Sequence, residues 1–197
     1  MNHDSVFTDH TVETAPEAVR PALRGTAKKF GTVPPAMARM AESPALVEGF
    51  TTLLRIFDGS SLAPLEREVL VVTVASFTGC EVCVAIHSAA LGALGAPPEL
   101  VDALRAQRPL HDRRLEALRG FTRAVLERRG DVGSGLAPDE PLAAFLAAGF
   151  NRREALDVVL GVGTYTMSTY ANRMTRAPLT SPAPSAASAR TTPTSPA

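Results

Sequence analysis

Two cysteines and a histidine lie close together in the middle of the chain, in an order that suits thiol chemistry. Cys80 and Cys83 are the only cysteines of the 197-residue sequence, and His87 follows the second of them by four positions. On a helix these residues are i,i+3 and i,i+4 neighbours, so the three side chains share one face. An imidazole near a thiol can accept its proton and stabilise the nucleophilic thiolate. The segment therefore predicts a redox-active dithiol.

The residues that precede the dithiol add a helix break and a carboxylate. Thr78-Gly79 predicts a break, which places Cys80 at a helix N-terminus, where free N–H groups and the helix dipole stabilise a thiolate. If the chain folds back there, Glu68 can reach His87, orient the imidazole and act in a proton relay. Because His87 is one turn from Cys83 and two turns from Cys80, we expect Cys83 to be the nucleophile and Cys80 the resolving thiol.

Two other interpretations of the cysteine pair stay open. Cys80, Cys83, His87 and Glu68 offer the four ligands of a zinc site, although the sequence lacks the second Cys or His pair that structural zinc sites usually have. The pair can also be two buried structural thiols, since cysteine is often buried. That second interpretation leaves the histidine on the same helical face unexplained.

Composition excludes several classes of protein. Lys+Arg and Asp+Glu are both 20, so the zero formal net charge argues against nucleic acid or an anionic membrane as a partner. No signal-peptide core precedes residue 10, and the longest apolar run, 69–77, is too short to span a bilayer. Two closely spaced cysteines do not form a secreted disulfide framework. We therefore expect a cytoplasmic protein without a membrane segment.

Apolar periodicity and Gly/Pro punctuation predict an all-α fold, in which one helical domain (16–176) follows a flexible N-terminus (1–15) and precedes a disordered Pro/Ser/Thr/Ala tail (177–197). The β-branched run 69–74 resembles a strand, but its charged flank and the lack of a partner strand favour helix. Helices are expected at about 17–30, 36–41, 45–57, 64–77, 80–94, 98–106, 113–129, 139–148 and 152–175.

A faint internal similarity connects the two halves of the chain. Arg67-Glu68-Val69-Leu70 resembles Arg153-Glu154-Ala155-Leu156 at an offset of 86 positions, and Cys80 then falls on Thr166. This is either a degenerate repeat that has lost its thiols or two helices with a common core pattern. The apolar runs 69–77 and 156–162 also predict that subunits associate.

The cysteine segment resembles the alkylhydroperoxidase D-like branch of the carboxymuconolactone decarboxylase superfamily. That family has Glu, eleven residues, Cys, two residues, Cys, three residues and His, which Glu68, Cys80, Cys83 and His87 match without a gap. Other stretches that resemble longer members are Phe30-Gly31-Thr32-Val33-Pro34, Ser43-Pro44-Ala45-Leu46, Gly59-Ser60-Ser61-Leu62 and Tyr170-Ala171-Asn172-Arg173. The resemblance covers roughly residues 18–179.

The resemblance implies an alkylhydroperoxidase D-like helical bundle that assembles as a homotrimer or homohexamer. It implies a peroxiredoxin-type antioxidant peroxidase that reduces small hydroperoxides, needs no cofactor or metal, and takes electrons from a lipoylated or thioredoxin-like protein. Cys83 is then peroxidatic, Cys80 resolving, and His87 and Glu68 form a proton relay.

One position departs from the family pattern. Well-studied members have a histidine directly before the second cysteine, where this chain has Val82, so one relay step is missing or replaced. The superfamily's decarboxylases generally lack the Cys-x-x-Cys pair, which disfavours lactone decarboxylation. The alternatives to a peroxidase are a redox-sensing dithiol protein and a zinc-stabilised binding module.

Overall fold

The computed structural model describes residues 5–179, and every regular element in that range is helical, which confirms the all-α prediction. The expected helices are all present with bounds shifted by a few residues, and the first of them begins as a short 3-10 helix. The elements are η1 (Glu17–Val19), α1 (Arg20–Phe30), α2 (Pro35–Met40), α3 (Pro44–Asp58), α4 (Pro64–Thr78), α5 (Glu81–Ala93), α6 (Pro98–Arg105), α7 (Arg113–Glu127), α8 (Pro141–Ala147) and α9 (Arg152–Met174).

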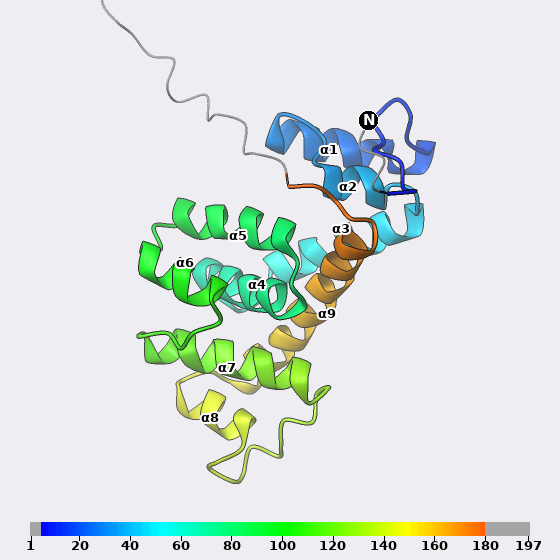
Figure 1. Cartoon of the computed structure of the whole chain (residues 1–197). Helices are drawn as coiled ribbons and strands as arrows, with labels where there is room; N and C mark the ends of the chain where they lie inside the picture. The colour runs from blue at the N-terminus through cyan, green and yellow to red at the C-terminus, as the bar shows by residue number, and fades with distance from the viewer. Residues whose placement is uncertain (1–4, 180–197) are drawn as a thin grey trace, which may run out of the picture.

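Helix α4 is the centre of the fold, and helices α5, α7 and α9 pack against it (Figure 1). The side chains of Val69, Leu70, Val71, Val72 and Val74 are each at most 1% exposed. Partners on several sides of α4 explain why its apolar residues form a continuous run and not the one-sided stripe of a surface helix. The β-branched run is therefore a buried helix, as its charged flank predicted.

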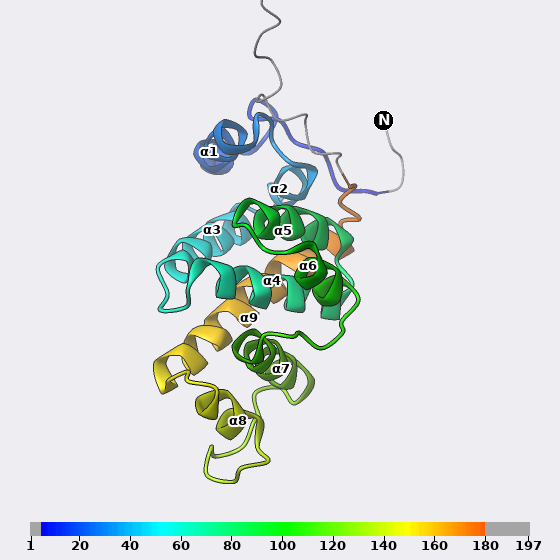
Figure 2. The ribbon, with the colours of Figure 1, turned by 90° about the vertical axis from the view of Figure 1, so that its left-hand side faces the viewer.

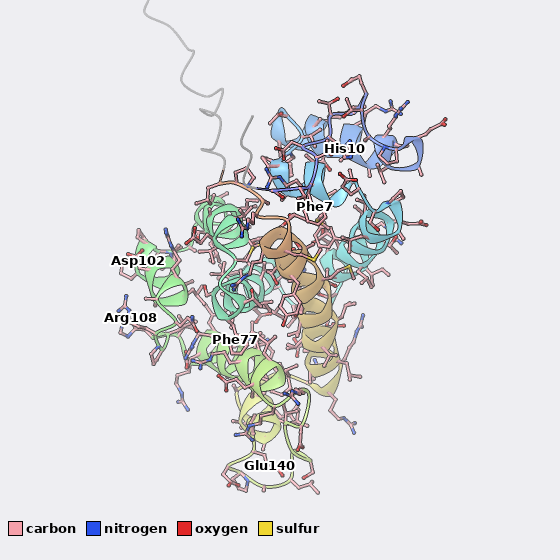
Figure 3. All side chains as sticks on the ribbon, turned by 45° about the vertical axis from the view of Figure 1, so that its right-hand side comes forward. Phe7, His10, Phe77, Asp102, Arg108 and Glu140 are labelled. Atoms are coloured by element: carbon pink, nitrogen blue, oxygen red, sulfur yellow. The ribbon has the colours of Figure 1, made fainter. Side chains whose placement is uncertain are left out.

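The remaining helices extend the bundle in opposite directions from this centre (Figure 2). Helices α1 and α2 lie at one end, above α3, and α7 and α8 lie at the other. Phe7 and His10 mark the first end, and Glu140, which precedes α8, marks the second (Figure 3). Separate apolar clusters fill the larger part of the molecule and the α1–α3 end, and Leu54 contacts both of them.

A single arginine connects the beginnings of α4, α7 and α9. The Arg114 Nε donates to Glu66 Oε1 at 2.7 Å, its Nη2 lies 3.5 Å from Glu154 Oε1, and its guanidinium stacks 3.7 Å from the Phe150 ring centroid. Each glutamate also accepts a hydrogen bond from the backbone N–H at its own helix start, at Ala63 and Asn151. This ion-pair cluster fixes the two long helices relative to each other at one end.

The internal similarity between the two halves of the chain is confined to the first turns of two helices. Arg67–Leu70 and Arg153–Leu156 occupy the first turns of α4 and α9. At the offset of 86, however, Gly79 corresponds to Tyr165, where α9 continues without a break. The second half therefore has one continuous helix where the first half has a corner.

The apolar faces that suggested association of subunits differ in exposure. The run in α4 is covered within the chain, so it does not argue for a partner. On α9, Leu156, Val159, Tyr170 and Met174 are 50–71% exposed. The expected homotrimer or homohexamer stays a prediction, which now depends on α9 alone.

The two ends of the described chain are held together around one buried arginine. Arg39 donates to both carboxylate oxygens of Asp9 and to the backbone oxygens of Thr175 and Arg176. Within the segment predicted to be flexible, residues 5–15 thus have defined contacts, and Ala15 is buried. The predicted tail lies outside the described residues beyond Leu179. In the part of the chain that the structure describes, no helix is both long enough and apolar enough to cross a membrane.

We predict opposite effects for two glycines of α9. A Cβ on Gly161 would lie 2.6 Å from the Phe57 ring and 2.9 Å from Leu70, whereas a Cβ on Gly163 would meet nothing within 4 Å. Gly161→Ala should lower the free energy of unfolding by about 1–3 kcal/mol through overpacking. Gly163→Ala should raise it by up to about 1 kcal/mol through helix propensity. Urea unfolding measures both, and equal effects would contradict the close packing at Gly161.

Candidate functional site

The corner between α4 and α5 places the two cysteines. Gly79 ends α4 with a positive φ of 69°, a conformation that glycine adopts without strain. The N–H of Cys80 then donates to the Ala75 carbonyl at 2.9 Å, and the N–H of Gly79 donates to the Ser76 carbonyl at 3.2 Å. A Cβ on Gly79 would also lie 2.7 Å from Arg173 Nη1. The break predicted at Thr78-Gly79 is therefore present, and the positive φ is the reason that the corner favours glycine.

Cys80 is the N-cap of α5 and not one of its helical residues. Its backbone is extended, with φ of −89° and ψ of 92°, while Cys83 lies in the first helical turn. The expectation that both cysteines share a helical stripe therefore needs correction, because Cys80 lies just outside the helix, beside its N-terminus. Both cysteines are free thiols, 2% and 3% exposed.

The two thiols are strongly coupled. The Cys83 side chain donates to the Cys80 sulfur and lowers the pKa of Cys80 to about 6; burial opposes the shift, and the N–H groups of Cys83 and Val82 assist it. The pKa of Cys83 is raised, because its proton is held against Cys80 and because it is buried. At neutral pH the pair therefore shares one proton and carries one negative charge, centred on Cys80.

Glu68 and His87 form a second pair, across the same corner. Their Oε2 and Nδ1 atoms are 2.8 Å apart, and both side chains are about one-fifth exposed. The ring of Tyr165, on α9, meets the His87 ring edge-on at a centroid distance of 5.1 Å. The chain thus folds back as expected and brings the carboxylate to the imidazole.

The histidine is not directly bonded to a thiol. His87 lies one turn after Cys83 on α5, as expected, but within residues 5–179 its hydrogen bond goes to Glu68 and not to either sulfur. The pKa shifts of both thiols likewise arise from groups other than His87. The site consists of two adjacent pairs, a dithiol and a carboxylate–imidazole pair.

A cavity of about 320 Å³ opens at Cys80. It is formed by the α4–α5 corner, the end of α9 and the segment that follows α9, and its lining comprises Gly79, Cys80, Glu81, Val82, Asn172, Arg173, Arg176, Ala177, Pro178 and Leu179. Cys83 and His87 are not part of the lining. A small molecule that enters from this side therefore meets Cys80 first.

The ligand set of the zinc interpretation does not converge. Among the described residues, no three His, Cys, Asp or Glu side chains are placed to hold a metal ion together. The carboxylate–imidazole pair and the dithiol face different neighbours, and the cysteine side chains are engaged with each other. The geometry supports thiol chemistry better than a zinc-stabilised module.

Sequence reasoning missed Asn172 as a member of the site. Asn172 Nδ2 donates to Cys83 Sγ at 3.2 Å, across 89 positions of sequence. Tyr165 is buried against His87, Phe50 and Phe57, and burial raises the pKa of its hydroxyl. The one available signal for Asn172 was a polar amide in the stretch 170–173, which already resembled the family.

The fold places the chain in the class of AhpD-like helical proteins. Its structure superimposes on the "alkylhydroperoxidase AhpD core: uncharacterized peroxidase-related protein" from Ralstonia eutropha JMP134 with a TM-score of 0.79 and 19% identity, over 91% of this chain and 94% of that chain. An uncharacterized peroxidase-related protein from Silicibacter sp. TM1040 gives a TM-score of 0.73 and 22% identity, over 89% of this chain and 92% of that one.

A family resemblance comes from the sequence of the central helices. The model of the Carboxymuconolactone decarboxylase family matches residues 41–123, a segment that includes Glu68, Cys80, Cys83 and His87. This match and the two structures confirm the resemblance to the AhpD-like and carboxymuconolactone decarboxylase proteins. No match was found among the curated proteins.

The shared proton predicts a specific pH dependence for alkylation of the dithiol by iodoacetamide. Because Cys80 has a pKa of about 6, the rate should rise tenfold per pH unit up to about pH 6 and level off above it. The rising part of this profile is its limb, and the pH at which the limb ends reports the pKa of the reacting thiol. Cys83→Ser retains a hydroxyl donor toward Cys80 and should keep this limb. Cys80→Ser should move the limb above pH 8, since only the buried Cys83 remains. A wild-type limb near pH 9 would contradict the coupling.

Proposed function

We propose that this protein is a thiol-dependent peroxidase that reduces small hydroperoxides through a Cys80–Cys83 dithiol/disulfide cycle. The observation that carries the proposal is a proton-sharing dithiol at a helix N-terminus, with one thiolate against an open cavity. A pKa near 6 keeps the nucleophilic form dominant at neutral pH. The adjacent second thiol supports rapid closure of a disulfide. The two similar structures are both of proteins described as peroxidase-related, which agrees with this activity.

The first half of the cycle transfers one oxygen atom to sulfur. The thiolate attacks the terminal oxygen of ROOH, the O–O bond breaks, and the sulfur becomes a sulfenic acid while RO⁻ leaves and takes a proton to give ROH. The second cysteine then attacks the sulfenic acid sulfur and displaces hydroxide, which leaves as water. Starting from one thiolate and one thiol, these steps consume one proton from solvent. The peroxide is reduced by two electrons and the dithiol is oxidised by two.

An external dithiol closes the cycle by thiol–disulfide exchange. Its thiolate attacks one sulfur of the disulfide, and its second thiol resolves the mixed disulfide and releases the reduced protein, with return of one proton. The sum is ROOH and a dithiol converted to ROH, water and a disulfide. A lipoyl- or thioredoxin-like protein stays the proposed reductant, and a cytoplasmic location stays a prediction.

Two observations support Cys80 as the attacking sulfur, the reverse of the order expected from the sequence. Cys80 carries the lowered pKa, and it lines the cavity from which a peroxide would enter. Cys83 was expected to attack because it lies one turn from His87, but the imidazole is engaged with Glu68 instead. We therefore propose Cys80 as peroxidatic and Cys83 as resolving.

Glu68 and His87 fit the role of a proton relay beside the dithiol. The imidazole is held by the carboxylate at 2.8 Å, is partly exposed to solvent, and lies one turn from Cys83. An oriented, partly solvated imidazole can pass protons between solvent and a neighbouring group. This pair can serve the proton exchange of the neighbouring Cys83 when that thiol attacks the sulfenic acid. It can do so without the histidine that relatives carry at the position of Val82.

The order of attack has a direct test with tert-butyl hydroperoxide and a dihydrolipoamide reductant. The wild type should consume one peroxide per disulfide formed and turn over continuously. Cys80→Ser should abolish oxidation, whereas Cys83→Ser should consume one equivalent and form a sulfenic acid that dimedone traps. Mass spectrometry of the intact protein measures each state.

The other results of that experiment discriminate between the alternatives. A trapped sulfenic acid in Cys80→Ser, with an inert Cys83→Ser, would restore Cys83 as the nucleophile. A wild type that oxidises once but does not turn over with any dithiol would support the redox-sensing alternative. A wild type that leaves peroxide unconsumed would refute the peroxidase.

We predict that the relay depends on the charge of Glu68 and not only on its hydrogen bond. Glu68→Gln retains a hydrogen-bonding partner for His87, yet it should lower the peroxidase rate constant by about 10–100-fold at pH 7, because general acid–base catalysis contributes about that much or more. Tyr165→Phe, which keeps the ring against His87, should change the rate less than threefold. Stopped-flow measurement of both variants checks this, and an unchanged rate for Glu68→Gln would remove the relay from the mechanism.

A further inference from the structure

Asn172 has an unusual environment for a residue on a long core helix. It lies in the last turn of α9, is 4% exposed, and its Nδ2 donates to Cys83 Sγ at 3.2 Å. Its Oδ1 is buried and has no hydrogen-bond partner among the described residues. Buried carbonyl oxygens nearly always accept a hydrogen bond, so an orphaned one requires an explanation. The amide is satisfied on the side of the sulfurs and unsatisfied on the other.

The same amide also acts on the first cysteine. Hydrogen bonding from Asn172 contributes to the lowered pKa of Cys80, and it partly offsets the raised pKa of Cys83. One carboxamide nitrogen, which carries two N–H bonds, therefore serves both sulfurs of the dithiol. Asn172 further lines the cavity that opens at Cys80. It is thus adjacent both to the reacting sulfurs and to the space from which a substrate approaches.

The backbone holds Asn172 rigidly in this place. Arg39 binds the carbonyl oxygens of Thr175 and Arg176 just beyond it, and the N–H of Ala177 donates to the Asn172 carbonyl. Arg173, the next residue, donates to the carbonyl of Thr78 at the α4–α5 corner. The end of α9 is therefore fixed to the same corner that positions the cysteines.

We propose that Asn172 is a further catalytic residue beside the dithiol, whose N–H groups hold the negative charge of the two sulfurs and whose Oδ1 accepts the hydroxyl hydrogen of a bound hydroperoxide. The oxygen that carries this hydrogen is the one that the thiolate attacks. After transfer, the same O–H belongs to the sulfenic acid, so one acceptor serves the reacting oxygen before and after the O–O bond breaks. Binding of ROOH would thereby satisfy the orphaned atom.

The role toward peroxide rests on the proposed function, and the role toward the thiolate does not. Iodoacetamide reacts with the thiolate but brings no hydroxyl to Oδ1, so it separates the two. The other polar groups near the sulfurs are Ser168, which faces Cys83, and Tyr165, both on α9. The charged side chains along the cavity are Glu81, Arg173 and Arg176. None of these five residues is substituted in the variants that test the proposal.

The experiment compares the pH profiles of Asn172→Leu and wild type with iodoacetamide and with tert-butyl hydroperoxide. In both profiles Asn172→Leu should move the limb found near pH 6 in wild type upward by about one pH unit, because a donor to the thiolate is lost. On the plateau above the limb, the rate constant with peroxide should fall by about 10–100-fold, while that with iodoacetamide should change less than threefold. Thr164→Val, which alters a fully buried hydroxyl elsewhere on α9, should leave both profiles unchanged.

Three results would overturn the assignment. An unmoved limb with equal plateau losses for both reagents would make Asn172 purely structural. A limb moved downward would mean that the amide oxygen, and not the nitrogen, faces the sulfurs. Equal plateau rates with peroxide would remove the role of Oδ1.

If Asn172→Leu lost its helical circular dichroism, Asn172→Asp, which preserves the shape of the side chain, would be used in its place. Its carboxylate should move the limb upward by more than one pH unit. A wild type inert to peroxide would refute the peroxidase and still leave the limb as the test of the thiolate role.

Discussion

The site depends on how the chain turns between α4 and α5. Gly79 takes a positive φ, and the N–H groups of Gly79 and Cys80 close back onto the carbonyls of Ser76 and Ala75. This closure leaves Cys80 in extended backbone at the very start of α5, where the backbone N–H groups of Val82 and Cys83 help to lower the pKa of its thiol. It also turns α5 back along α4, which brings His87 to Glu68. One reversal of the backbone thus creates both the thiolate and the carboxylate–imidazole pair.

The helix that completes the site comes from the far end of the sequence. Helix α9 runs through the bundle beside α4, and its side chains contact each part of the centre in turn. Gly161 admits Phe57 and Leu70, Tyr165 meets His87, and Asn172 reaches Cys83. Because Arg114 fixes the beginning of α9 and Arg39 fixes its end, these contacts are set by a single rigid element.

The sequence predicted those parts of the site that local rules determine. Helix bounds followed from Pro and Gly, and the pairing of Glu68 with His87 followed from one break and one helical turn. The position of Cys80 outside the helix was missed, since a Cys-x-x-Cys pair at a helix start fits either register within one residue. Asn172 was missed for a different reason: its contact spans 89 residues, and apolar periodicity gives no signal on α9. The buried face of this helix includes polar residues such as Ser168 and Thr169, while Leu156 and Val159 are exposed. Long-range packing, not motif spacing, decides which polar residue of such a helix faces the sulfurs.

The hydrogen bonds that surround the Cys80 sulfur have a consequence for the reduction potential of the pair. The N–H groups of Val82, Cys83 and Asn172 stabilise an anion, and a disulfide sulfur has no comparable charge for them to bind. Their stabilisation therefore belongs to the reduced form alone, which shifts the potential of the couple toward oxidising values. Strong oxidants among thiol proteins owe their potentials to the same asymmetry. The oxidised state of this protein is thus poised to take electrons from a dithiol donor, and the helix terminus that prepares the nucleophile also favours its regeneration.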